Sequence, residues 1–157
     1  MGTRLGKYTK DLPKCMLEFL GKPLIERQVE TLASSGIDDI TVVTGYQSDK
    51  IMIPGVKYYK NEKYSETNMV ESLFTAEAEL KGEILVAYSD IIYERKTVEK
   101  ILETEVDIGV TVDNDYWEYW QARLDDPTND IESMVVNNDG NIIELGMACG
   151  MDKAKMR

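Results

Sequence analysis

The fold is most readily predicted from the basic opening of the chain, MGTRLGKYTKDLPKCMLEFLGKPL, residues 1–24. Residues 1–14 set Arg4, Lys7, Lys10 and Lys14 against a single acid, Asp11, although the whole 157-residue chain has a formal net charge of −11. Backbone amides beside a glycine, together with lysine and arginine, supply the hydrogen-bond donors and positive charge that a triphosphate requires. The alternative interpretation is a solvated, mobile chain end, which has a similar composition.

Outward from this stretch, short apolar strands alternate with amphipathic helices. Gly21-Lys22-Pro23 opens a predicted helix that ends at Gly36, because proline suits the first turn and glycine stops a helix. Asn68, with Glu71 three residues later, predicts the start of a helix that reaches about Lys81. The other predicted elements are strands at 39–44, 56–60, 83–88 and 106–112, a short helix at 97–103, and a hairpin from 131–136 to 141–145. This alternation predicts a single α/β domain, residues 1–157, with a mainly parallel sheet.

The composition excludes several classes of function. Apolar content of 43% and charged content of 30% are those of a soluble globular protein. No apolar run could span a membrane, and no secretory leader precedes the basic opening, so neither a membrane partner nor export is expected. Two cysteines, Cys15 and Cys149, with no histidine, favour a reducing cytoplasm over the alternative of a disulfide, and they argue against zinc sites and histidine-activated nucleophiles. The negative net charge argues against nucleic-acid binding.

A second candidate site residue is Asp90, which follows the predicted strand at 83–88. In open α/β sheets, ligands bind at the carboxyl ends of the strands. Magnesium prefers oxygen ligands and commonly takes one or two protein carboxylates. Asp90 is therefore a candidate magnesium ligand, and the alternative is a turn or helix-capping aspartate.

Three blocks in the opening carry a family resemblance: Gly2-Thr3-Arg4-Leu5, then Pro13-Lys14, then Gly21-Lys22-Pro23-Leu24. Together they resemble the nucleotidyltransferases that activate sugar phosphates and phosphocholine, and the phosphocholine or phosphonate cytidylyltransferase-like branch most of all. Later blocks follow in the family's order, at 67–73 (TNMVESL), 88–91 (YSDI), 120–123 (WQAR) and 125–127 (DDP). The resemblance implies a Rossmann-like three-layer nucleotidyltransferase fold with a mixed, mainly parallel sheet.

The resemblance also implies roles for individual residues. Lys14 would lie against the reacting phosphates, Arg4 would hold the leaving pyrophosphate, and Asp90 would bind Mg²⁺. The remaining nucleotide-binding residues would be Gly2 and Thr3 at the triphosphate, Asn68 and Ser72 near the base or ribose, and Ser89. The reaction would be transfer of CMP from CTP to a small phosphorylated alcohol such as phosphocholine, or to a phosphonate, with release of pyrophosphate.

The chain also departs from the family pattern. Family members carry a buried strand of the form K-A-I-I-L-A-A-G before G-T-R-L, and a second metal-binding aspartate late in the chain, and neither is found here. We therefore expect a chain truncated at both ends, with the first strand missing. Two alternatives to a cytidylyltransferase stay open, a sugar-1-phosphate nucleotidylyltransferase and a catalytically inactive remnant that acts as a binding subunit.

Residues 113–126, DNDYWEYWQARLDD, form the candidate acceptor site. Trp117 and Trp120 lie among acidic side chains, and aromatic faces beside carboxylates suit a quaternary ammonium or an amine. Arg123 would take the acceptor's phosphate. The alternative is that these aromatic residues are core or form a contact between the subunits of a homo-oligomer.

Overall fold

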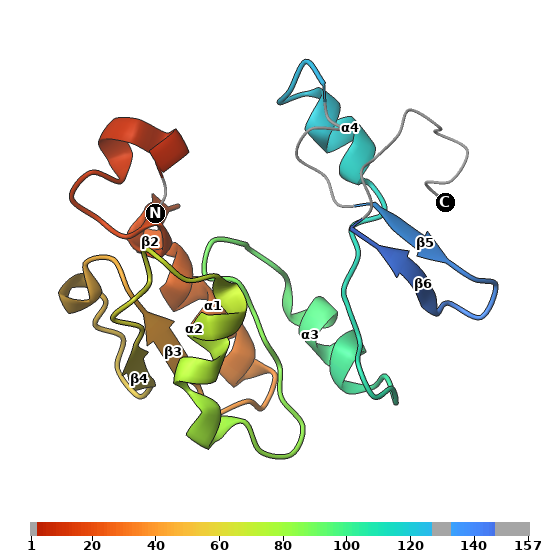
Figure 1. The fold of residues 1–157 in the computed structure, drawn as a ribbon, viewed down its shortest axis with the longest axis horizontal. Coiled ribbons are helices and arrows are strands. Elements are labelled where there is room, and N and C mark those ends of the chain that lie inside the picture. The colour runs from red at the N-terminus through yellow and green to blue at the C-terminus, as the bar shows by residue number, and fades with distance from the viewer. Residues whose placement is uncertain (1–2, 127–132, 147–157) are drawn as a thin grey trace. The chain divides into compact units, whose positions relative to one another are not determined.

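The computed structural model describes residues 3–126 and 133–146, which belong to two compact units, residues 1–110 and 111–157 (Figure 1). The predicted single domain stays a prediction, and each unit is described by itself. None of the helices in the described ranges is long and apolar enough to cross a membrane.

The first unit is built around a parallel strand pair, β3 (Thr41–Thr44) with β4 (Lys57–Lys60). Thr41 lies opposite Lys57 and Thr44 opposite Lys60, so both predicted strands are confirmed and parallel. Gly45 ends β3 at a close contact, since a Cβ there would lie 2.6 Å from the Cβ of Tyr64. The turn η3 (Ser48–Lys50) lies in the connection between the two strands.

Before this pair, the basic opening forms two turns and a tight hairpin that leads into the first helix. The turns are η1 (Thr3–Tyr8) and η2 (Lys14–Met16), and the hairpin pairs β1 (Glu18–Phe19) with β2 (Lys22–Pro23). Leu20 and Gly21 close the hairpin with φ of 50° and 75°, a conformation that favours glycine at the second position. Helix α1 (Leu24–Ser34) follows directly, with Pro23 just before its first residue, as predicted.

The core of the first unit joins the opening turns, α1 and the parallel pair. Cys15, Ile25, Ile51 and Ile53 are buried together, with Val42 of β3 partly buried against them. Helix α1 also packs against α3 (Arg95–Leu102), whose Val98 is buried. Because Cys15 belongs to this core, the neighbouring Lys14 is fixed at its edge. The short helix predicted at 97–103 is confirmed.

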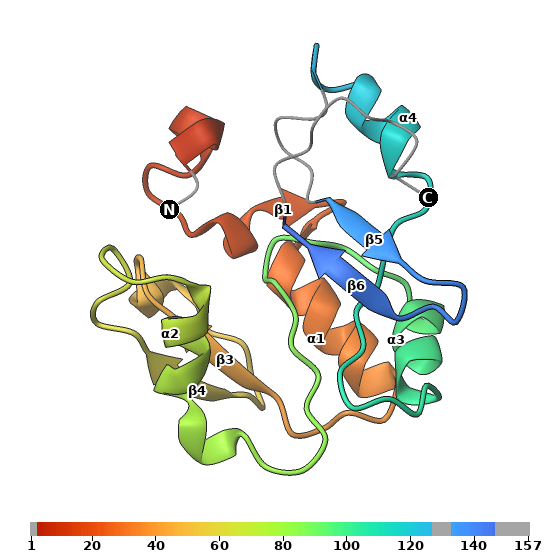
Figure 2. The same cartoon turned by 45° about the vertical axis from the view of Figure 1, so that its right-hand side comes forward.

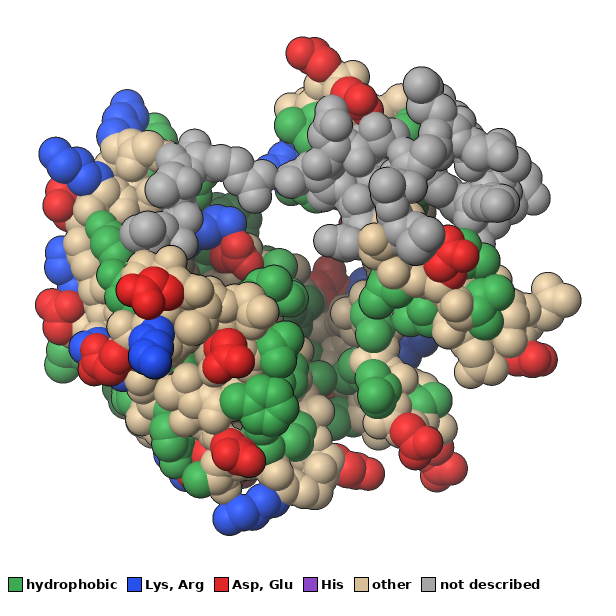
Figure 3. All heavy atoms as spheres, viewed as in Figure 1, with side chains coloured by type: hydrophobic (Ala, Val, Ile, Leu, Met, Phe, Trp, Pro, Cys, Tyr) green, Lys and Arg blue, Asp and Glu red, His purple; other side chains and the backbone are tan. Residues whose placement is uncertain are grey.

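Helix α2 (Met69–Thr75) begins where the capping signal predicts, and it lies beside β3 (Figure 2). It is shorter than predicted, since only the turn η4 (Glu77–Glu79) continues it. Met69 and Phe74 are exposed, and apolar side chains gather on the surface over α2 (Figure 3).

The predicted strands at 83–88 and 106–112 are not found, and this corrects the sequence prediction. Neither segment takes part in a strand ladder, and Ile84, Val86, Val106 and Ile108 are exposed. Local sequence gives the preference for extended backbone, whereas a strand also needs a neighbour that satisfies its amides and carbonyls. The described residues supply no such neighbour for either segment.

The second unit contains α4 (Tyr116–Gln121) and an antiparallel hairpin of β5 (Met134–Val136) with β6 (Ile142–Leu145). Asn137 closes the hairpin turn, because its side-chain oxygen accepts hydrogen bonds from the backbone amides of Asp139 and Asn141. The predicted hairpin is confirmed for its described residues. The chain is α/β with mixed parallel and antiparallel pairing, as predicted, and within the described residues the parallel pairing is limited to β3 and β4.

Candidate functional site

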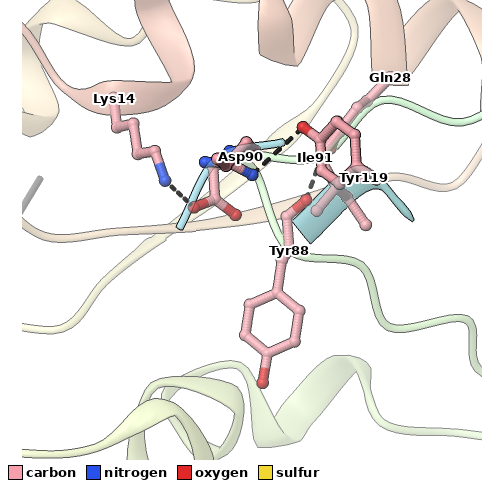
Figure 4. Close-up of polar contacts among 7 residues, drawn as sticks. Lys14, Gln28, Tyr88, Asp90, Ile91 and Tyr119 are labelled. Carbon is pink, nitrogen blue, oxygen red and sulfur yellow. Dashed lines mark hydrogen bonds and ion pairs between the residues drawn. The ribbon is translucent and has the colours of Figure 1, made fainter. Parts of the chain in front are cut away.

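The first unit brings Lys14 and Asp90 into direct contact, although they are 76 positions apart in the sequence. The Lys14 Nζ donates to Asp90 Oδ2 at 2.5 Å, and both side chains remain partly exposed, at 40% and 35% (Figure 4). A lysine and a carboxylate open to solvent at one point provide a positive charge for phosphate oxygens and an oxygen ligand for a cation. The structure thus pairs the two side chains on which the sequence prediction mainly depends.

Lys14 is held by its own turn. Pro13 precedes η2 and its carbonyl accepts from the amide of Met16, which closes the turn. Cys15, the next residue after Lys14, is 5% exposed and belongs to the core. Burial raises the pKa of the Cys15 thiol, the Asp90 carboxylate adds to that increase, and a hydrogen bond with Ser89 opposes it. The thiol is therefore next to the turn that carries Ser89 and Asp90.

The Asp90 turn is held from α1. Gln28 Nε2 donates to the backbone carbonyl oxygens of Tyr88 at 2.8 Å and Ile91 at 2.5 Å. Gln28 was missed by the sequence analysis, but a signal existed, since this polar residue occupies the apolar stripe of α1 between Ile25 and Leu32.

The basic opening is tied to the end of β3 by contacts that the sequence analysis also missed. Tyr46 donates its hydroxyl to the Lys10 carbonyl at 2.6 Å, and Lys50 donates to the Asp11 carbonyl. Residues 10–11 are thus anchored beside the carboxyl end of a parallel strand, where the strand-end rule expects a ligand. Thr3 and Arg4 lie in η1, Gly2 lies outside the described residues, and the roles predicted for all three stay predictions.

Asn68 and Ser72 belong to a separate hydrogen-bond network at the start of α2. The Asn68 side-chain oxygen accepts from the amides of Val70 at 3.0 Å and Glu71 at 3.1 Å, which confirms the predicted cap. The buried Asn61 donates to the Ser72 hydroxyl at 3.0 Å. These contacts do not join either residue to Lys14 or Asp90, so their nucleotide-binding role also stays a prediction.

The predicted acceptor residues lie in the second unit, where they contact one another. The Arg123 guanidinium lies 4.8 Å from the ring centre of Trp120 and 5.1 Å from that of Tyr119. Trp117 makes an edge contact with Tyr116, with ring centres 6.3 Å apart. The Arg123 guanidinium thus lies over two of these aromatic rings, and the acceptor role of Trp117, Trp120 and Arg123 stays a prediction.

Magnesium has one candidate ligand at the first-unit site. No cluster of three or more histidine, cysteine or acidic residues occurs within residues 3–126 and 133–146. A single carboxylate agrees with magnesium sites completed by water and nucleotide phosphates, rather than with a cage made wholly of protein ligands. Asp90, partly exposed beside Lys14, fits that pattern.

Comparison with known proteins gives the family. The model for the MobA-like NTP transferase domain matches residues 1–126. The CTP:phosphoglutamine cytidylyltransferase of Campylobacter jejuni is 36% identical over 156 residues, which cover 92% of this chain and 61% of that protein. The choline-phosphate cytidylyltransferase of Streptococcus pneumoniae is 32% identical over 97 residues, 59% of this chain and 42% of that protein. The chain therefore spans 61% and 42% of the length of these two relatives, less than two thirds in each case.

A solved structure of the CTP:phosphocholine cytidylyltransferase from Streptococcus pneumoniae is 36% identical, with a TM-score of 0.43 over 50% of this chain and 36% of that one. The family match covers both Lys14 and Asp90 and most of the chain. On that match, this chain belongs to the MobA-like NTP transferase domain family.

Proposed function

We propose that this chain carries the nucleotide site of a nucleotidyltransferase that moves CMP from CTP to a small phosphorylated acceptor and releases pyrophosphate. The observation that carries the proposal is the Lys14–Asp90 contact at 2.5 Å within a chain of this family. It brings a mobile positive charge and a cation ligand to one point, which is the chemistry that two reacting anions require.

The reaction follows from charge. An ionised oxygen of the acceptor's phosphate attacks the α-phosphorus in line, a new P–O bond forms, and the bond to pyrophosphate breaks. No protein nucleophile or general base is needed, since the attacking oxygen is already an anion, and this agrees with a chain without histidine. Lys14 would neutralise the oxygens at the α-phosphorus, and Arg4 would hold the pyrophosphate. Mg²⁺, when held by Asp90 with the triphosphate, supplies further positive charge.

The acceptor is proposed by class. Relatives are named for phosphoglutamine, choline phosphate and 2-aminoethylphosphonate, the last in Lancefieldella rimae at 30% identity over 59% of this chain. All three acceptors combine a phosphorus oxyanion with a nitrogen-containing group. Trp117, Trp120 and Arg123 are the proposed acceptor residues, because aromatic faces attract a cationic head and an arginine binds a phosphate in bidentate fashion. A reducing cytoplasm and a homo-oligomer remain predictions.

A sugar-1-phosphate acceptor is the second candidate. The mannose-1-phosphate guanyltransferase of Aspergillus oryzae is 40% identical, but over 81 residues, 52% of this chain and 21% of that protein. The shared part therefore supports a common nucleotide site more than a common acceptor.

The test is a pyrophosphate-release screen of the purified protein with Mg²⁺. Each of four nucleoside triphosphates is combined with phosphocholine, 2-aminoethylphosphonate, glutamine phosphate and mannose 1-phosphate. We expect release with CTP and a nitrogen-containing acceptor, and its loss in Lys14→Ala. Lys60→Ala is the matched control, since Lys60 pairs with Glu62 at 2.9 Å and is not part of the proposed site. GTP with mannose 1-phosphate as the productive pair would favour the second candidate, and no release with any pair would refute transfer by this chain.

A further inference from the structure

We infer that Gln28 is a positioning residue that holds the Tyr88–Ile91 turn, and with it the Asp90 carboxylate, opposite Lys14. The inference deepens the proposed function and depends on it for its catalytic meaning. Gln28 is 7% exposed on α1, and its one amide group donates to two carbonyl oxygens 60 and 63 positions later in the chain.

The two acceptors bracket the functional residues of the turn. The carbonyls of Tyr88 and Ile91 flank Ser89 and Asp90, so the two hydrogen bonds fix the backbone at both ends of that pair. Figure 4 shows the Asp90 carboxylate pointing to Lys14 and the Tyr88 ring pointing away from it. No strand ladder holds residues 88–91 in the part of the chain that the structure describes.

A second contact holds the same turn from η2. The Lys14 Nζ donates to Asp90 Oδ2, and the buried Cys15 is the next residue of η2. The turn is thus tied to α1 through Gln28 and to η2 through Lys14. Releasing Gln28 would leave Asp90 on a segment without regular structure, where a carboxylate has no fixed distance to Lys14.

The chemistry of the site requires an amide at position 28. Two carbonyl oxygens need two donors from one side chain, and a glutamine NH₂ group has two N–H bonds. Methionine has a similar length but no donor. Asparagine keeps the donors on a side chain that is one methylene shorter. Removing a residue that orients a ligand typically lowers metal affinity or activity about 10–100-fold.

The experiment compares Gln28→Met and Gln28→Asn with Val29→Ala, each in a Cys149→Ser background so that Cys15 is the one thiol labelled. Val29 is partly buried against the core on the next position of α1, so its truncation controls for loss of helix packing. Three quantities are measured: the midpoint of urea unfolding, the rate of Cys15 labelling by a disulfide reagent, and kcat and KM for CTP.

We expect Cys15 to be labelled about tenfold faster in both Gln28 variants than in Val29→Ala at a matched loss of stability. The reason is that the released turn no longer holds η2 through the contact of Asp90 with Lys14, the residue before Cys15. We also expect kcat to fall about 10–100-fold with KM for CTP changed less than about twofold. If Gln28→Met does not fold, the same comparison is made with Gln28→Asn, which keeps a donor.

Labelling equal to that of Val29→Ala would overturn the inference, and so would faster labelling with an unchanged kcat. If the parent protein shows no transfer with any substrate pair, the proposed function fails. The labelling comparison then still decides whether Gln28 holds the turn, so the two failures can be told apart.

Discussion

At the scale of single residues, the site depends on where two opposite charges are held. Lys14 follows Pro13 in a closed turn and precedes the buried Cys15, so its backbone is fixed while its side chain remains open to solvent. Asp90 lies on a turn held by the side chain of Gln28. An ion pair this exposed contributes little to stability, about 0–1 kcal/mol. In the proposed function, its value is that both groups are already in place for an incoming nucleotide.

Lys14→Ala and Arg4→Ala should separate two roles of positive charge. Lysine is a compact charge that can follow the α-phosphate through the reaction, whereas arginine is a planar fork suited to a fixed oxyanion pair. We expect Lys14→Ala to lower the single-turnover rate about 10²–10³-fold with a smaller effect on CTP affinity. Arg4→Ala should weaken CTP affinity as well. Equal rates for the parent and Lys14→Ala would show that the basic cluster is a solvated chain end.

Asp90→Asn tests the metal ligand at nearly constant shape. The substitution removes the charge that a magnesium ion requires and one exposed ion pair, so we expect loss of Mg²⁺-dependent turnover with an unfolding midpoint close to that of the parent. The readout is pyrophosphate release across a Mg²⁺ titration, beside urea unfolding. Turnover within about threefold of the parent would remove Asp90 from the site.

At the scale of elements, Asn68 has a confirmed role as the cap of α2 and a predicted role at the nucleotide. The side-chain oxygen of Asn68 is committed to the cap, through the amides of Val70 and Glu71. A nucleotide contact would therefore fall to its NH₂ group. Ser72, one turn later, is held by Asn61, so the start of α2 is rigid around that NH₂ group.

The comparison of Asn68→Asp with Asn68→Ala separates the cap from the nucleotide contact. Aspartate caps a helix as well as asparagine does, whereas alanine costs about 0.5–2 kcal/mol of stability. We expect Asn68→Asp to retain the unfolding midpoint and to weaken CTP affinity at least about tenfold, because a donor is lost and a negative charge is gained. Asn68→Ala should lower both. Parent-like CTP binding by Asn68→Asp, measured by calorimetry, would leave Asn68 with the cap alone.

At the scale of the whole molecule, much apolar surface in the described residues lies outside the core. The segments 83–88 and 106–112 expose Ile84, Val86, Ile108 and Val110 by half or more. Exposed apolar segments without ladder partners favour association with other strands. The molecule therefore keeps its site residues in place through a small core while two extended segments stay uncovered.

Self-association should follow from these segments. We expect the parent protein to bind a hydrophobic dye and to sediment as a concentration-dependent mixture, because association buries apolar surface. The double variant Val86→Lys with Ile108→Lys should shift it toward the monomer, since charges at unpaired strands block pairing. The control is Lys63→Ala, which changes an exposed charge outside both segments. Val56→Lys would not serve as a control, because Val56 packs against the core. A stable, dye-free monomer in the parent would contradict this expectation.

The elements with local signals could be predicted from the amino-acid sequence. Proline and glycine bounded α1, the Asn68 cap began α2, and period and turn residues predicted β3, β4 and the β5–β6 hairpin. The motifs of the opening and of residues 88–91 also indicated the family, which the family match over residues 1–126 confirms, while the roles of the basic residues and Asp90 stay predictions. Local patterns work here because a helix cap or a hairpin turn is decided by residues within a few positions of one another.

Which distant groups meet became clear from the folded chain alone. It brought Lys14 to Asp90 across 76 positions, and it placed the Gln28 amide against carbonyls 60 and 63 positions away. The segments 83–88 and 106–112 have no strand partners in the described residues, although the sequence predicts a strand for each. The physical reason is the same in each case: a hydrogen bond between distant segments depends on how the core aligns their backbones, and no local pattern of residues carries that information.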